Sequence, residues 1–89
     1  MPSDRPELNP DLIVELNQAT QDVLAKVRTQ AVVDAVMVVR LSQQIVAYHS
    51  DNAVYVEKMW ETVLLLAKVV ERQGEQELAT RLRAIAARR

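Results

Sequence analysis

Glycine and proline, the residues that most often interrupt regular structure, are almost absent from this chain after its first ten residues. The three prolines are Pro2, Pro6 and Pro10, and the only glycine is Gly74. A sheet of several strands needs more turn residues than this, so the sequence predicts an all-α fold. The fourteen valines favour strands by local propensity alone, and a strand over residues 36–41 is the minority alternative.

The size and composition of the chain predict a soluble protein with one small core. Its 89 residues form at most one domain, and because it has no cysteine it has neither disulfides nor thiolate metal ligands. No uninterrupted apolar run is longer than five residues, as at 63–67, whereas a membrane-spanning helix needs roughly 20. The first six residues lack the apolar stretch of a secretory signal. We therefore expect a cytoplasmic protein that does not enter a membrane.

Ordered helical structure is predicted to begin at Asn9. Asn9 is a favourable N-cap, Pro10 suits the first helical position, and Asp11 places a negative charge in the first turn. The eight residues before this point contain prolines and charges but almost no apolar side chains. We therefore expect a flexible lead-in over residues 1–8 and a single helical domain over residues 9–89.

Downstream of Pro10, apolar residues recur at the spacing of an amphipathic helix. They are Leu12, Leu16, Ala19, Val23 and Val27, with polar residues between them. Residues 31–39 are then apolar on all sides except at Asp34. Because no glycine or proline separates the two stretches, the helix either continues to about residue 48 or breaks near residues 28–30.

The main reversal of the chain is predicted at residues 49–52, where four polar side chains offer turn and helix-capping chemistry. A second helix then begins near Ala53 and carries a broad apolar face: Met59, Trp60, Val63, Leu64, Leu66, Ala67 and Val70. Gly74 either ends this helix or lies inside a longer one, at a cost of about 1 kcal/mol relative to alanine. The pattern predicts an antiparallel helical hairpin of two long helices, or of three or four shorter helices if these break.

An antiparallel hairpin pairs residues that lie equally far before and after its reversal. Residues 32–39 then face residues 62–69, so the two most apolar segments meet. The acidic beginning of the chain lies beside its basic end, which pairs Asp11, Glu15 and Asp22 with Arg81, Arg83, Arg88 and Arg89. Agreement between the apolar pattern and the charge pattern is expected of a sequence that specifies one fold.

Two long helices that are apolar on most sides need further neighbours. A homodimer that completes a four-helix bundle would supply them, since two-fold self-association is the commonest kind. The predicted self-association residues are Val32, Val36, Val39, Val63, Leu66 and Val70. If the helices break at both weak points, four short helices of one chain can close a core by themselves.

The residue types that carry catalysis or bind metals are scattered along the sequence. His49 is the only histidine, and one imidazole is too few for a metal site. Two carboxylate pairs, Glu57 with Glu61 and Glu71 with Glu75, lack the histidines of a carboxylate-bridged metal centre. One glycine cannot form a phosphate-binding loop. We expect a non-enzyme without cofactor or metal.

The leading functional hypothesis is a helical protein–protein interaction module: a small adaptor, regulator or inhibitor that binds another protein. Its small size and lack of active-site chemistry are compatible with a phage or other mobile-element origin. The candidate partner-binding residues are Tyr48, Tyr55, Met59 and Trp60, which lie near the reversal and belong to types enriched at interface centres. Packing of Trp60 into the core is the alternative for that residue.

Nucleic-acid binding is the second hypothesis. Arg81, Arg83, Arg88 and Arg89 give the last nine residues a charge of +4, which could contact phosphates. The net charge of −1 for the whole chain argues against it. A third class, a bundle that encloses a small ligand, is also open because an apolar interface can hold a pocket.

Overall fold

The protein is all-helical in the computed structural model, which describes residues 9–49 and 51–89. These residues form four helices and no strand: α1 (Pro10–Lys26), α2 (Gln30–Tyr48), α3 (Ala53–Arg72) and α4 (Gln76–Ala87). The predicted all-α fold is confirmed. The alternative strand over residues 36–41 is wrong, because these residues lie inside α2. The predicted lead-in at residues 1–8 lies outside the described residues.

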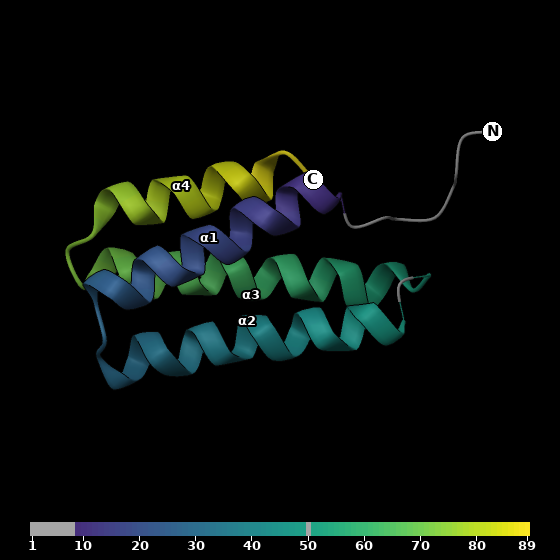
Figure 1. Cartoon of the computed structure of the whole chain (residues 1–89), viewed down its shortest axis with the longest axis horizontal. Helices are drawn as coiled ribbons and strands as arrows, with labels where there is room; N and C mark the ends of the chain where they lie inside the picture. The colour runs from purple at the N-terminus through teal and green to yellow at the C-terminus, as the bar shows by residue number, and fades with distance from the viewer. Residues whose placement is uncertain (1–8, 50) are drawn as a thin grey trace.

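Successive helices run in opposite directions and form an antiparallel four-helix bundle (Figure 1). α3 packs against α2 on one side and against α4 on the other, and α1 lies beside α4. The bundle is elongated, with extents of 43 × 20 × 17 Å. The beginning of α1 therefore lies next to the end of α4 (Figure 1).

Local capping determines where three of the helices begin. The side chain of Asn9 accepts a hydrogen bond from the Asp11 N–H at 2.9 Å, as predicted for the start of α1. The Thr29 hydroxyl accepts from the Val32 N–H at 3.4 Å at the start of α2. The Asn52 side chain accepts from the Val54 N–H at 3.0 Å at the start of α3. Each cap satisfies a backbone donor that the first helical turn leaves free.

Both weak points of the sequence are breaks in the structure. Val27 after α1 is extended, and Thr29 then starts α2. At the end of α3, Gly74 has a positive φ of 89°. The Gly74 N–H donates to the Glu71 carbonyl at 3.0 Å and the Glu75 N–H donates to the Val70 carbonyl at 3.2 Å. This pair of bonds is a Schellman motif, whose left-handed residue is usually glycine.

Breaking at both points lets one chain supply all four helices around a common core. All six predicted self-association residues are buried in that core: Val32, Val36, Val39, Val63, Leu66 and Val70. Their neighbours in this structure are other helices of the same chain. Self-association through these residues stays a prediction. It would require two chains to exchange helices, so that the same side chains pack against the partner chain.

Candidate interaction surfaces

One side of α2 remains exposed although it is largely apolar. The side chains buried under the bundle are Val32, Val36, Val39 and Val46. At about 100° per residue, Leu41 projects from the opposite side of the helix. We define the α2 outer face by its exposed residues Asp34, Met37, Val38, Leu41, Ile45 and Tyr48. Leu41 is 53% exposed and Tyr48 is 86% exposed.

The α2 outer face carries very little charge. Asp34 and Arg40 are the only charged residues of α2. Arg40 lies toward α1, where it lines a depression with Asn17 and Gln21. Among the described residues, α2 is the one helix long and apolar enough to cross a membrane by length and composition alone. Asp34 is thus the single charged group of an otherwise apolar or uncharged face.

The exposed side of the neighbouring helix α3 has a different composition. It carries Lys58, Glu61, Lys68 and Arg72, and its exposed apolar side chains are Val54, Tyr55, Leu64 and Leu65. Leu65 is 58% exposed. Charged residues are interspersed with these apolar side chains, as is typical of a solvated helix, whereas the exposed apolar side chains of the α2 outer face have only Asp34 among them.

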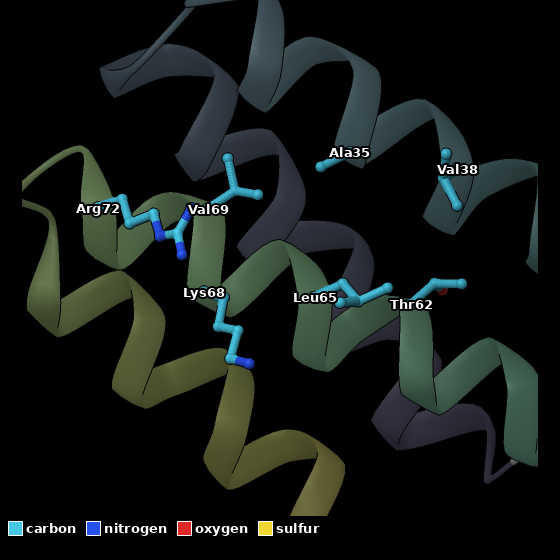
Figure 2. Close-up of a pocket in the computed structure, with 7 residues that line it drawn as sticks. All are labelled: Ala35, Val38, Thr62, Leu65, Lys68, Val69 and Arg72. Carbon is cyan, nitrogen blue, oxygen red and sulfur yellow. The ribbon is translucent and has the colours of Figure 1, made fainter.

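A groove separates α2 from α3 on the outside of the bundle. Its volume is about 420 Å3, and it is lined by Ala35, Val38, Thr62, Leu65, Lys68, Val69 and Arg72, which we call the α2–α3 groove. Figure 2 shows Ala35 and Val38 on α2 across from Val69, Leu65 and Thr62 on α3. The sequence pairing of residues 32–39 with residues 62–69 is therefore confirmed.

Two cations stand at the α3 side of this groove. Figure 2 shows the Arg72 side chain beside Val69, while the Lys68 side chain extends away from α2. The five ion pairs within residues 9–49 and 51–89 involve neither Lys68 nor Arg72. The groove thus combines an apolar floor with positive charge that the described part of the chain does not neutralise.

The four C-terminal arginines are each paired with a carboxylate. Arg81 Nη1 lies 2.6 Å from Asp22 Oδ2, Arg83 Nη1 lies 2.8 Å from Glu71 Oε2, and Arg89 Nη1 lies 3.3 Å from Glu57 Oε2. The fourth pair joins Arg88 to Glu15. The predicted proximity of Asp22 and Glu15 to the basic end is confirmed, whereas Arg83 and Arg89 pair with carboxylates of α3.

Two of these pairs shift the pKa of the groups involved. The hydrogen bond from Arg81, assisted by one from Gln18, lowers the pKa of Asp22 below its ordinary value of 3.8. The hydrogen bond and charge of Arg83 lower the pKa of Glu71 below 4.5, and the same hydrogen bond raises the pKa of Arg83. Hydrogen bonding to an ionised form favours that form.

The four candidate partner-binding residues near the reversal are separated by the fold. Met59 and Trp60 are buried, with Trp60 only 2% exposed, so both belong to the core in this structure. Tyr48 projects into solvent at the end of α2. Tyr55 is partly exposed, and its ring centroid lies 5.1 Å from that of His49. Only the two tyrosines are presented on the surface.

A second depression, which the sequence did not indicate, lies between α1 and α2. It has a volume of about 580 Å3 and is lined by Ile13, Asn17, Gln21, Arg40, Gln43, Gln44 and Ala47. The Gln43 side chain donates to the Asn17 side chain across it at 3.1 Å. Four of its seven lining residues carry amide groups, whereas the α2–α3 groove has none, so the lining of this depression suits an apolar partner less well.

In the described part of the chain, no group of three or more His, Cys, Asp or Glu side chains is placed to hold a metal ion. The features that stand out are therefore surfaces: the α2 outer face and the α2–α3 groove. Comparison with protein-family models, with curated proteins and with solved structures found no match to this chain. The function is inferred from these surfaces alone.

Proposed function

We propose that this protein is a non-enzymatic, cytoplasmic interaction module that acts as a homodimer and binds another protein as an adaptor, regulator or inhibitor. The observation that carries the proposal is the exposed apolar surface formed by the α2 outer face and the adjoining α2–α3 groove. Contiguous apolar patches on soluble proteins usually mark interaction sites, because leaving them in water forfeits the free energy of burial.

The α2–α3 groove fits an amphipathic helix of another protein. A helix laid into a groove contacts it through apolar residues on one face. Val38 and Leu65 stand on opposite walls, where they can hold such residues. Lys68 and Arg72 at the edge favour a partner that carries carboxylates beside its apolar face. The proposed occupant is therefore an acidic amphipathic helix.

The homodimer can form in two arrangements. In the arrangement predicted from the sequence, α1 and α2 form one long helix, and α3 and α4 form another. Two such hairpins then exchange helices and complete a four-helix bundle with the same core contacts. In the other, two complete bundles of the kind in Figure 1 associate through an exposed surface. The second arrangement needs no rearrangement of the helices.

Nucleic-acid binding has less support. Its candidate residues Arg81, Arg83, Arg88 and Arg89 each lie against a carboxylate. Contact with phosphates would first require these ion pairs to separate, and the freed carboxylates would then repel the phosphate backbone. Charges neutralised within the protein contribute little to counterion release, which drives nucleic-acid affinity.

The proposal is tested by affinity capture from the native host with matched baits. The baits are the parent, a groove variant with Leu65→Asp and Arg72→Glu, and a control with Val14→Asp, since Val14 is an exposed apolar residue of α1. We expect mass spectrometry to identify a protein that the parent and the control retain and the groove variant loses. Retention of every captured protein by the groove variant would contradict binding in the α2–α3 groove.

A further inference from the structure

We propose that the α2 outer face binds the same face of a second copy, with the two α2 helices antiparallel about a two-fold axis that passes beside Leu41. This inference rests on the homodimer part of the proposed function and goes beyond it by naming the surface, the orientation and the residue pairs. The two surfaces share Val38, but the other residues of the α2 outer face do not line the α2–α3 groove.

The spacing along the α2 outer face is that of a helix that packs against one partner helix. Asp34, Val38, Leu41, Ile45 and Tyr48 follow one another at intervals of four, three, four and three residues. Alternation of three and four keeps side chains on one side of a helix and is the spacing by which paired helices interlock. All five residues are exposed in the single bundle, so this side of α2 has no partner within the described chain.

The face is complementary to itself when one copy is turned end over end. Leu41 lies at its centre, seven residues from Asp34 and seven from Tyr48. An antiparallel pair centred there places Leu41 against Leu41 of the second copy. It also brings Val38 within one residue of the level of Ile45 of the second copy, about 1.5 Å along the helix axis, and Ile45 equally close to its Val38. Every apolar residue of the row then meets another, as a closed two-fold interface requires.

The polar ends of the row also match in this orientation. Asp34 of each copy lies opposite Tyr48 of the other, so each phenol O–H can donate a hydrogen bond to a carboxylate. Hydrogen bonds to charged groups are among the stronger ones. Among residues 9–49 and 51–89, the Asp34 carboxylate accepts only from the neighbouring Gln30 side chain, at 2.7 Å, which leaves acceptor capacity on its oxygens.

A parallel pair does not satisfy the same groups. It would place Asp34 opposite Asp34 at the edge of an apolar contact, where two like charges repel each other without a nearby cation. It would also align the two helix dipoles, whereas the antiparallel pair opposes them. The antiparallel orientation follows from the position of this one carboxylate.

The charge of the face favours a second copy over a membrane surface. Helices that lie on membranes carry lysine or arginine beside their apolar residues, because lipid headgroups are anionic. The one basic residue of α2, Arg40, lies on the α1 side and lines the polar depression there. The cations of the adjoining groove, Lys68 and Arg72, stand on α3, and the Lys68 side chain extends away from α2 (Figure 2). A second copy provides a further hydrogen-bond donor for Asp34, in addition to Gln30 of the same chain.

The first test is the mass of the protein in solution, measured by light scattering at micromolar concentration. The parent should have twice the chain mass of 10.1 kDa. Leu41→Asp should raise the dimer dissociation constant by about 100-fold or more, because two carboxylates meet on the axis. Val14→Asp on α1 should leave it unchanged, and circular dichroism should show that both variants fold, since both positions are exposed.

Mixing variants tests the two-fold axis directly. Leu41→Asp and Leu41→Lys should each be monomeric when pure, yet form a heterodimer when mixed, because position 41 of one copy faces position 41 of the other. No other position in the row has this property in the antiparallel pair. Failure of the mixture to associate would place the axis elsewhere.

Single cysteines determine the orientation, because the chain has no cysteine of its own. With a short bismaleimide cross-linker, Leu41→Cys should link to itself, and Val38→Cys should link to Ile45→Cys in a mixture. Self-linking of Val38→Cys in the absence of Ile45→Cys would show a parallel pair and overturn the proposed orientation.

The remaining outcomes separate this inference from the proposed function. A parent dimer that Leu41→Asp does not dissociate would assign self-association to another surface, such as exchanged helices, and would refute only this inference. A parent that is monomeric at micromolar concentration would refute the homodimer as well, but not binding in the groove. Binding of the parent, but not of Leu41→Asp, to vesicles of phosphatidylcholine and phosphatidylglycerol would assign the face to a membrane instead.

Discussion

Arg81 Nη1 on α4 lies 2.6 Å from Asp22 Oδ2 on α1, although the two residues are 59 positions apart in the sequence. The contact joins the first helix to the last, and it lowers the pKa of Asp22. Both side chains remain partly exposed, so solvent and salt weaken the attraction between them. Its main measurable consequence is a dependence of stability on pH.

We predict that stability falls in acid. The folded pKa values of Asp22 and Glu71 are below their ordinary values, so each carboxylate adds stability above its unfolded pKa, and this stability is lost as the pH falls through the folded pKa. The melting temperature should decrease from about pH 5 to about pH 3. In the double variant Asp22→Asn, Glu71→Gln the decrease should be smaller. An equally steep decrease in this variant would show that other carboxylates are responsible.

Trp60→Ala should destabilise the fold by about 3 to 5 kcal/mol, because it removes a large buried side chain from the core. That loss is enough to unfold much of a small domain. Val54→Ala on the same helix is the control, and its effect should stay within about 0.5 kcal/mol because Val54 is exposed. Thermal melting followed by circular dichroism measures both. A melt of Trp60→Ala close to that of the parent would contradict the burial of this side chain.

Gly74→Ala should cost about 1 kcal/mol of stability, because an alanine rarely adopts the positive φ of 89° that ends α3. Apart from residue 74 itself and its two chain neighbours, no atom stands within 4 Å of the position where the new Cβ would lie, so the cost is conformational rather than steric. Gly74→Asn should lose less, since asparagine tolerates this conformation better. Urea denaturation distinguishes the two. Equal stability of all three proteins would mean that α3 and α4 can join without penalty.

Replacing Arg88 and Arg89 with alanine should leave the helical content and the oligomeric state nearly unchanged. These arginines are the last two residues of the sequence, and they pair with Glu15 and Glu57 on the surface. Their loss should matter little because exposed ion pairs contribute little to stability. Gel-shift experiments on the parent should show no binding to nucleic acid that weakens with salt. Such binding in the parent, lost in the double variant, would instead favour a nucleic-acid-binding regulator.

The α2–α3 groove should prefer an acidic amphipathic peptide to a basic one. The probe is a fluorescent helical peptide with leucines on one face and glutamates beside them, and its control has lysines in place of the glutamates. Fluorescence anisotropy should show tighter binding of the acidic peptide, and Lys68→Glu with Arg72→Glu should reverse this preference because the charge of the groove edge is inverted. An unchanged preference would exclude these cations from recognition.

The helix boundaries depended mostly on local chemistry, so the sequence predicted much of them. Asn9 and Asn52 cap their own helices through side-chain oxygens that reach backbone groups two residues away. Thr29 and Gly74 mark the two breaks, and both were visible as weak points. Whether the chain breaks there was not decided locally, because a long helix and two short ones satisfy nearly the same backbone hydrogen bonds.

The charge pattern likewise predicted that the ends of the chain lie together, which Glu15 with Arg88 and Asp22 with Arg81 confirm. Long-range pairing of this kind follows from the antiparallel order of the helices and not from their exact orientation. Arg83 and Arg89 instead reach Glu71 and Glu57, because α3 is the other neighbour of α4.

By itself, the sequence determined that the chain is helical, roughly where it reverses, and which segments are apolar enough to form a core. It selected Val32, Val36 and Val39 as packing residues, but it could not choose which of the other sides of α2 stays uncovered, because residues 31–39 are apolar on nearly every side. That choice depends on where α1 and α3 lie against it. Only the tertiary structure buries Val36 and leaves Leu41 in solvent, and this orientation creates the exposed face from which the dimer is inferred.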